Sequence, residues 1–378
     1  MGPGPSDVAP AVLHAMSKPL LGHLDPAFLE IMNDIMEQLR ILFNTKNALT
    51  MPMSGTGSAG METAFVNVIE PGDVVVVGVK GVFGQRMVDV ASRCGAEVIA
   101  VEAPMGEMIE PGQIKEALSK HPKVKAVAIV HAETSTGVRQ PLKEIAEMAK
   151  EHGALFIVDA VTSLGGIPVD VDEIGIDVCY SGTQKCISCP PGLAPISMNA
   201  RAQKALHDRK TPVSSWYLDL TMVERYWGEE RFYHHTAPIS MSYALREALR
   251  IIAEEGLEAR WARHELNANA FSAGCEAMGL DLFAQEGYRL PSLVTLKVPE
   301  KVDDAKVRGH LLQRFNIEIS GGLGPVKGQI WRGGLMGSNS NPKNILLALT
   351  ALASALNAQG FKASASAALE AATAVYDG

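Results

Sequence analysis

The sequence predicts an α/β fold, in which a large domain with a mainly parallel sheet between helices precedes a smaller C-terminal α+β domain. Apolar runs of strand length recur along the chain, and several are continuous in Val, Ile and Ala instead of alternating with polar residues. Such runs are typical of strands buried on both faces of a sheet. Helical segments separate the runs, an order that produces parallel strands. The expected strands are residues 73–77, 97–101, 125–130, 154–158, 177–180 and 194–198, with helices at 84–94, 111–120 and 141–152.

The pattern changes from about Ser240, and this change predicts the second domain. A long helical stretch is followed by short strands and by a helix that ends near Asn357, while an alanine-rich tail suits one more helix. We expect the large domain at residues 21–255 and the small domain at 256–378. The expected C-terminal elements are a helix at 241–273, strands near 293–298 and 318–320, and the tail helix within 362–376.

Composition limits the classes of function. A chain of 378 residues exceeds what one hydrophobic core usually organises, which also favours two domains. Hydrophobic residues make up 47% and no apolar run approaches the ~20 residues that span a bilayer, so we expect a soluble protein without a membrane partner. The net charge of -8 argues against binding to nucleic acid. The start of the chain has neither a basic region nor an apolar region, which predicts a cytoplasmic location.

The five cysteines are expected to be free thiols, because their number is odd and the chain has cytosolic character. Cys186 and Cys189 form a C-x-x-C spacing, which zinc or thiol redox chemistry could use. No second pair stands at a suitable spacing, and the following residues 190–192 suit a loop more than a redox helix. Incidental buried thiols are therefore favoured over a noncatalytic thiol or metal protein.

A glycine-rich segment at residues 54–60 precedes a helical run at 61–69 and predicts a phosphate cradle. Glycines let the backbone approach an anion, and a helix N-terminus offers unpaired N–H groups. The segment also spells G-x-G-x-x-G, so a nicotinamide oxidoreductase is one alternative, and a glycine-rich turn without a ligand is another. Pro52 lies where the nicotinamide fingerprint needs a central strand, which argues against the first alternative.

Two ionisable residues follow buried strands. Asp159 ends one expected strand and could instead cap the next segment. Lys185 comes just after another strand, and burial would lower its pKa and free its amine for reaction. Together with the cradle, this pair matches what pyridoxal phosphate requires. The carboxylate keeps the pyridine nitrogen protonated, while the lysine holds the aldehyde as a Schiff base and later carries the substrate proton.

At this point the chain resembles a known family, the alanine–glyoxylate and serine–pyruvate aminotransferases of class V, pyridoxal-phosphate fold type I. The resemblance runs from Gly2 to about Asn357 and implies a seven-stranded sheet. It is carried by Ser54–Gly57 with Glu62, by Gly84–Arg86, His131–Gly137, Val158–Gly166, Ser181–Lys185 and Tyr233–Thr236, and by Arg332 before Gly334 and Leu335.

The resemblance implies a role for each matching residue. Lys185 would form the Schiff base and Asp159 would pair with the pyridine nitrogen. An N-terminal segment at residues 1–20 would contact the active site and a partner subunit. Tyr233 and Thr236 would reach in from the other subunit, which makes the expected enzyme a homodimer. Further contacts are implied for Thr134 near the ring hydroxyl, Phe83 on the ring, Thr56, Gly57, Ser58 and Gln184 on the phosphate, Tyr233 and Thr236 on the phosphate of the other subunit, and Gly4 and Arg332 on the substrate.

Arg332 suits a substrate carboxylate because a guanidinium offers two parallel hydrogen bonds, and a surface salt bridge is its alternative. Phe83 replaces a tryptophan that is frequent in the animal enzymes, and Trp331 and Gly333 beside the arginine bear on the shape of the substrate pocket. Metal binding by His131, His234 and His235 is not expected, because adjacent histidines do not face one ion.

The resemblance therefore implies a ping-pong aminotransferase in which alanine or serine donates and glyoxylate or pyruvate accepts the amino group. A single evident carboxylate arginine favours small monocarboxylic substrates. Serine–glyoxylate, aspartate–glyoxylate and pyridoxamine–pyruvate aminotransferases are the alternatives within class V. A cysteine desulfurase is disfavoured because the glycine-rich segment 321–325 has no cysteine nucleophile.

Overall fold

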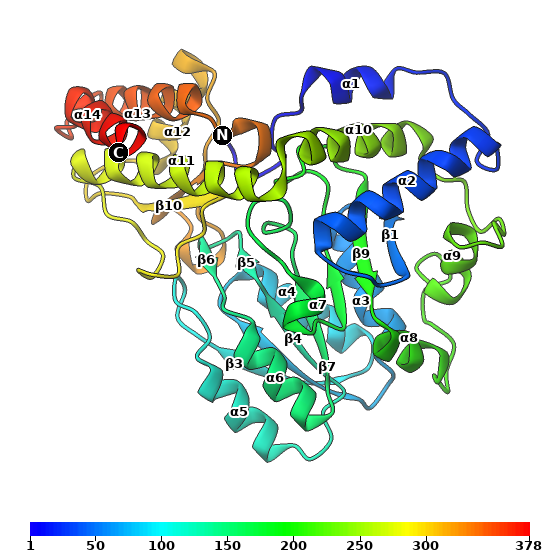
Figure 1. Ribbon diagram of the computed structural model, residues 1–378. Helices are drawn as coiled ribbons and strands as arrows, with labels where there is room; N and C mark the ends of the chain where they lie inside the picture. The colour runs from blue at the N-terminus through cyan, green and yellow to red at the C-terminus, as the bar shows by residue number, and fades with distance from the viewer.

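The computed structural model describes residues 1–378 and is built around a seven-stranded sheet of order β1-β9-β8-β7-β4-β2-β3 (Figure 1). All neighbours from β8 to β3 are parallel, whereas β9 is antiparallel to both β8 and β1. This confirms the predicted fold class. The strands are β1 (Leu49–Ser54), β2 (Val74–Val79), β3 (Glu97–Glu102), β4 (Ala126–Val130), β7 (Leu155–Asp159), β8 (Val178–Tyr180) and β9 (Leu193–Met198).

Helices cover both faces of this sheet, which explains the continuous apolar strands. Successive residues of β2 alternate between two buried clusters: Val75 and Val77 face one, and Val76 faces the other. The first cluster includes side chains of α3 (Gly57–Val68), α4 (Val82–Arg93) and α8 (Ala200–His207). The second includes side chains of α2 (Pro26–Phe43), α5 (Pro111–Lys120), α6 (Lys143–His152) and α10 (Ile239–Glu255).

The C-terminal region has its own antiparallel sheet of order β10-β12-β11 and its own buried cluster, which includes Trp331. We propose that this region is the small domain and that Gly256 marks its start. Its elements are α11 (Leu257–Ala277), β10 (Leu293–Lys297), α12 (Asp304–Phe315), β11 (Ser320–Gly321), β12 (Ile330–Gly334), α13 (Pro342–Asn357) and α14 (Ala365–Asp377). The remaining elements are α1 (Pro10–Met16), β5 (Ala132–Glu133), β6 (Val138–Arg139), α7 (Val171–Ile174), α9 (Leu220–Trp227) and two short 3-10 helices, η1 (Gly324–Val326) and η2 (Gly337–Asn339).

The expected helix at 241–273 is wrong as one element, because α10 and α11 are separate helices. They meet at Gly256, where φ of 80° and ψ of 140° interrupt the helical hydrogen bonding. A positive φ is easiest for glycine, so the residue permits the change of direction.

The first strand and the helix after it also differ from the sequence prediction. β1 is an edge strand in which Pro52 lies opposite Pro195, a position that tolerates a missing N–H. α3 begins at Gly57 instead of residue 61. β12, which carries Arg332, was not anticipated because its sequence Ile-Trp-Arg-Gly-Gly does not read as a strand. No helix combines the length and the apolar character that crossing a lipid bilayer demands.

Candidate active site

Four buried polar side chains stand in a row at the carboxyl edge of the large sheet. Lys80 follows β2, His131 follows β4, Asp159 ends β7 and Tyr180 ends β8. These strands are neighbours in the order β8-β7-β4-β2, and the four residues are between 0% and 6% exposed. Ligands of open α/β sheets bind outside this edge of the strands, so the row is a candidate binding site.

Asp159 is held in a fixed orientation within this row. Its Oδ1 accepts a hydrogen bond from the N–H of Val161 at 2.8 Å, and its Oδ2 accepts one from the hydroxyl of Tyr180 at 2.9 Å. Burial raises the pKa of Asp159 to about 6, while these two hydrogen bonds oppose the rise. The carboxyl group is thus fixed in place and uses the hydroxyl of Tyr180 as a support that the sequence analysis missed.

Lys185 lies in the loop after β8, beneath the N-terminal segment. Its ammonium donates to the carbonyl of Pro3, while the N–H of Ser6 donates to the carbonyl of Gln184 at 2.8 Å. A Cβ at Gly4, where φ is +106°, would lie 2.7 Å from Nζ of Lys185. Burial lowers the pKa of Lys185 to about 8 and Arg332 adds to the effect, although nearby acidic groups oppose it. A larger share of this amine is therefore neutral, and reactive, at moderate pH than in an exposed lysine.

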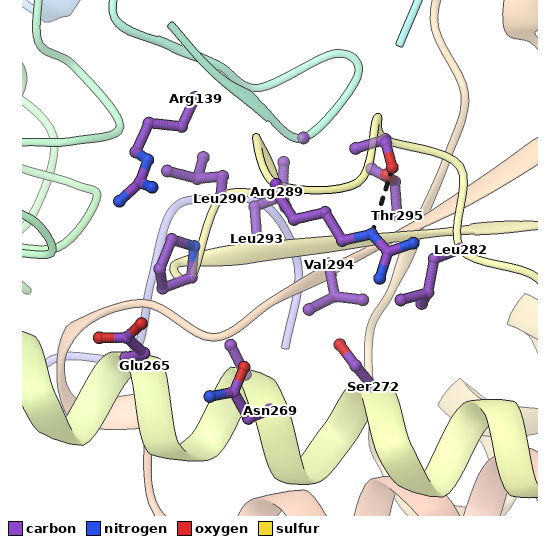
Figure 2. A pocket seen from close by; sticks show the side chains of 15 residues that line it. Arg139, Glu265, Asn269, Ser272, Leu282, Arg289, Leu290, Leu293, Val294 and Thr295 are labelled. Carbon is purple, nitrogen blue, oxygen red and sulfur yellow. Dashed lines mark hydrogen bonds between the residues drawn. The ribbon is translucent and has the colours of Figure 1, made fainter. Parts of the chain in front are cut away.

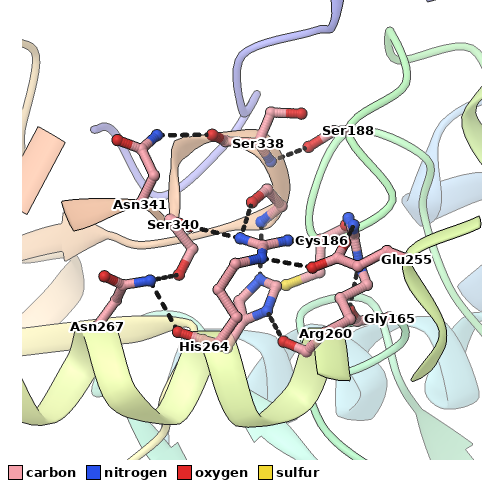
Figure 3. A network of polar contacts seen from close by, with 12 residues as sticks. Gly165, Cys186, Ser188, Glu255, Arg260, His264, Asn267, Ser338, Ser340 and Asn341 are labelled. Atoms are coloured by element: carbon pink, nitrogen blue, oxygen red, sulfur yellow. Dashed lines mark hydrogen bonds and ion pairs between the residues drawn. The ribbon is translucent and has the colours of Figure 1, made fainter. Parts of the chain in front are cut away.

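A hydrogen-bond network around Arg260 anchors the loop that carries Lys185 (Figure 3). Arg260, on α11, is 3% exposed and donates to the carbonyls of Gly165 at 3.0 Å and Cys186 at 2.5 Å, as well as to Glu255. His264, one turn further along α11, accepts from the N–H of Gly337 at 2.9 Å. The C-terminal region thus holds the backbone next to the lysine.

The predicted phosphate cradle lies beside the same loop. The N–H groups of Thr56, Gly57 and Ser58 at the start of α3 donate to no protein acceptor, and the hydroxyl of Thr56 makes no capping bond. A Cβ at Gly57 would approach the backbone of Gly182 to 3.5 Å, so the two segments are in contact. Gln184 has a buried Oε1 without a hydrogen-bond partner. Unpaired donors at a helix N-terminus fit an anion such as a phosphate group.

Thr134 and Phe83 lie close to this row. The hydroxyls of Thr134 and Thr162 are hydrogen-bonded to each other. Phe83 is in the first turn of α4 and has the guanidinium of Arg86 4.9 Å from its ring centre. The N-terminus of α4 faces the fully buried carboxylate of Glu133, which also accepts from Ser135. A role for Glu133 was not expected from the sequence.

Arg332 reaches the site from β12 of the small sheet. It is 6% exposed and donates to the carbonyls of Gly321 at 2.9 Å and Thr134 at 3.3 Å. No carboxylate lies within ion-pair distance of its guanidinium, so the alternative of a surface salt bridge is wrong. Burial lowers the pKa of Arg332, and the charge of Glu133 opposes this. A buried guanidinium without an anionic partner is suited to bind one.

Tyr233 and Thr236 lie in an exposed segment before α10 and are hydrogen-bonded to each other at 3.2 Å. Tyr233 is 47% exposed and has no hydrogen bond to the cradle of its own chain. Between them, Nε2 of His235 is hydrogen-bonded to the hydroxyl of Ser54 at 2.7 Å, and Nδ1 of His235 is hydrogen-bonded to Nδ1 of His234. Within one chain, Tyr233 therefore does not join the other predicted phosphate ligands.

Cys186 and Cys189 are fully buried and unpaired. Burial raises the pKa of both thiols, that of Cys189 to about 12, which suppresses thiolate chemistry. No three His, Cys, Asp or Glu side chains gather as a metal site would require.

A separate pocket of about 250 Å³ lies between β6 and α11 (Figure 2). It contains Arg139, Glu265 and Arg289, but none of the predicted site residues. The guanidinium groups of the two arginines point away from each other, so they do not converge on one ligand.

The seven-stranded, mostly parallel sheet with its helices matches the type I fold of pyridoxal-phosphate enzymes. Residues 4–329 match the class-V aminotransferase family, and the chain belongs to this family. It is an aminotransferase, and enzymes of this class depend on pyridoxal phosphate. Arg332 lies just beyond the matched residues.

Two kinds of relative are similar over nearly the full length. The (S)-ureidoglycine–glyoxylate transaminase of Bacillus subtilis is 43% identical, and the alignment covers 100% of this chain and 95% of the relative. The crystal structure of ureidoglycine–glyoxylate aminotransferase from the same species has a TM-score of 0.98 at 44% identity, covering 100% and 97% of the chains. An alanine–glyoxylate aminotransferase from Nostoc sp. has a TM-score of 0.93 at 48% identity and covers 94% of each chain.

Proposed function

We propose that this enzyme uses pyridoxal phosphate to move an amino group from a small amino acid, alanine or serine, to glyoxylate or pyruvate in a ping-pong reaction. The observation that carries the substrate class is Arg332, a buried guanidinium that contacts two carbonyls and no carboxylate. A substrate α-carboxylate would supply the missing anion through parallel charge-assisted hydrogen bonds.

The residues around the row fit the cofactor. Asp159 would face the pyridine nitrogen, and Lys185 would bind the aldehyde carbon. The unpaired N–H groups of Thr56, Gly57 and Ser58, together with the side-chain NH2 group of Gln184, would donate to the phosphate. When bound, the cofactor withdraws the electrons that are released at the substrate Cα.

Lys185 would also move the substrate proton. Its amine is buried and its pKa is lowered to about 8, so it can both accept and return a proton near neutral pH. The backbone of Pro3 and Gly4 covers the amine and would exclude water from it. Gly4 would leave room for the substrate, while Thr134 would contact the ring hydroxyl and Phe83 the ring face.

The substrates are proposed to be small monocarboxylates because the other buried arginine is not available. Arg260 is committed to Glu255 and to two carbonyls, so it cannot bind a second substrate carboxylate. Glyoxylate as the acceptor is supported by the names of both kinds of relative. The Bacillus relative also makes (S)-ureidoglycine a second candidate donor.

We also propose that the enzyme is a homodimer in which Tyr233 and Thr236 complete the partner's phosphate site. Four aromatic side chains on either side of α9 are exposed by between 43% and 61%, namely Trp216, Tyr217, Phe232 and Tyr233. Trp216 stacks on His234 and Tyr217 lies against His235, so these two aromatic side chains lie beside the segment of Tyr233. Exposed apolar surface of this kind is typical of an interface. A cytoplasmic location is proposed because all five cysteines are free, as a reducing compartment keeps them.

Single-turnover spectra test the donor. Each candidate donor is mixed with the cofactor-loaded enzyme, and the loss of the visible cofactor band is followed. We expect fast conversion with alanine or serine, and slow conversion with aspartate. Fast conversion with aspartate alone would overturn the proposed substrate class, whereas conversion with (S)-ureidoglycine alone would transfer the proposal to the second donor.

A further inference from the structure

Lys80 carries a buried amine to which the proposed reaction assigns no part. It follows β2 directly, is 1% exposed and is among the largest fully buried side chains. Its ammonium donates to the carbonyl of Val130 and to no other protein group, and no carboxylate lies within ion-pair distance. Lysine is rarely buried in this way, because desolvation of its charge is costly. The burial of Lys80 therefore indicates a role other than packing.

The position of Lys80 ties it to Asp159 through the sheet. Val130, whose carbonyl accepts from Lys80, is the register partner of Asp159 in the parallel pair of β4 and β7. The turn after Lys80 lies against Glu133, since a Cβ at Gly81 would come within 2.4 Å of the Glu133 carboxyl carbon. Lys80 thus stands close to two buried carboxylates without forming a direct pair with either.

Several other titratable groups lie around Lys80 and Asp159. Asp159 contacts Tyr180 and lies near Cys179, Lys185 and Glu133, and the N–H of His131 donates to its carbonyl at 3.0 Å. Burial and the charge of Lys80 lower the pKa of His131 to about 3, so the imidazole is neutral. Burial lowers the pKa of Lys80 to about 8, while Glu133 and Asp159 oppose this, so Lys80 is charged at neutral pH.

We propose that Lys80 is a positioning residue whose ammonium balances Glu133 and Asp159, and so keeps Asp159 ionised to receive the pyridine nitrogen. The inference rests on the proposed role of Asp159. Once Lys185 is bonded to the cofactor it is no longer a free ammonium, and His131 is neutral. Lys80 then remains as the permanent cation within the row, and its charge acts on Asp159 across the low-dielectric interior.

The test measures cofactor binding against pH. Cofactor-free protein is titrated with pyridoxal phosphate between about pH 5 and 7.5, and the visible absorbance gives the dissociation constant. In Lys80→Met, which keeps the length of the side chain, we expect the acid-side loss of binding to move up by about one pH unit. Binding should weaken about fivefold near pH 6, where Asp159 is half-ionised in the unmodified protein, and much less at pH 7.5. Lys80→Arg, which keeps the charge, should retain the pH profile.

A double variant separates charge from packing. Lys80→Met combined with Glu133→Gln removes one anion along with the cation, so its acid-side midpoint should return toward that of the unmodified protein. An unchanged midpoint in Lys80→Met, or a loss of binding equal at every pH and not relieved in the double variant, would overturn the inference. If the unmodified protein binds the cofactor with no acid-side loss, or if Asp159→Asn binds as well as it does, the proposed role of Asp159 fails instead.

Discussion

Replacement of Tyr180 by phenylalanine removes one hydroxyl from the interior and tests how Asp159 is held. The hydroxyl donates to Oδ2 of Asp159 at 2.9 Å, and both side chains are buried, so water cannot take its place. A hydrogen bond to a charged group contributes about 1.5–3 kcal/mol. At about 1.4 kcal/mol for each pH unit, its loss should raise the pKa of Asp159 by roughly one to two units from its value of about 6.

The assay is cofactor binding to Tyr180→Phe across pH. Because only the ionised carboxylate pairs with the pyridine nitrogen, affinity should fall about fourfold at pH 7 and more than tenfold at pH 6, and should recover near pH 8.5. Circular dichroism checks that the fold is retained. A loss of affinity that is the same at pH 6 and pH 8.5, or a midpoint that does not move, would refute the reasoning.

Three further predictions concern the other parts of the site. Arg332→Gln should raise KM for the amino donor about 100-fold, since it loses about 3 kcal/mol of charge-assisted bonding, while cofactor absorbance stays; Arg289→Gln, in the separate pocket, is the control, and equal effects of the two variants would contradict the assignment. Gly4→Ala should weaken cofactor binding about tenfold or more, because φ is +106° and the new Cβ would collide with Lys185. Gly72→Ala, with φ of +87° and no neighbour within 4 Å, controls for backbone strain alone, and this variant should bind the cofactor normally. Lys185→Met should stabilise the cofactor-free protein against urea more at about pH 7 than at about pH 10. Burial of the charged amine is unfavourable below its lowered pKa of about 8, and this penalty disappears as the pH rises toward the ordinary pKa of 10.5. A stability difference that does not depend on pH would mean that the amine is not desolvated.

Much of the large sheet was predictable because its strands are buried on both faces, so that their sequences have an unmistakable apolar character. Asp159 and Lys185 were singled out for a related reason, since Asp159 ends such a strand and Lys185 lies in the loop that follows one. The parallel direction of the strands, which brings their carboxyl ends to one edge of the sheet, followed from their alternation with helices, whereas the order of the strands did not.

The residues that surround Asp159 were missed because their contacts depend on the register between strands. In the sequence, Tyr180 resembles one more apolar position of β8, and Lys80 resembles an ordinary polar residue after β2. Their relation to Asp159 appears only when β2, β4, β7 and β8 are aligned. Similarly, the single glycine that separates α10 from α11 left no break in the helical pattern, so only its backbone angles reveal it.

The central claim is that the amine of Lys185 binds the aldehyde cofactor, and borohydride reduction tests it most directly. Reduction of the purified yellow protein, followed by digestion and mass spectrometry, should locate one pyridoxyl phosphate group per chain on the peptide that contains Lys185. An adduct on the peptide that contains Lys80, the other deeply buried lysine beside Asp159, or no adduct at all, would contradict the account.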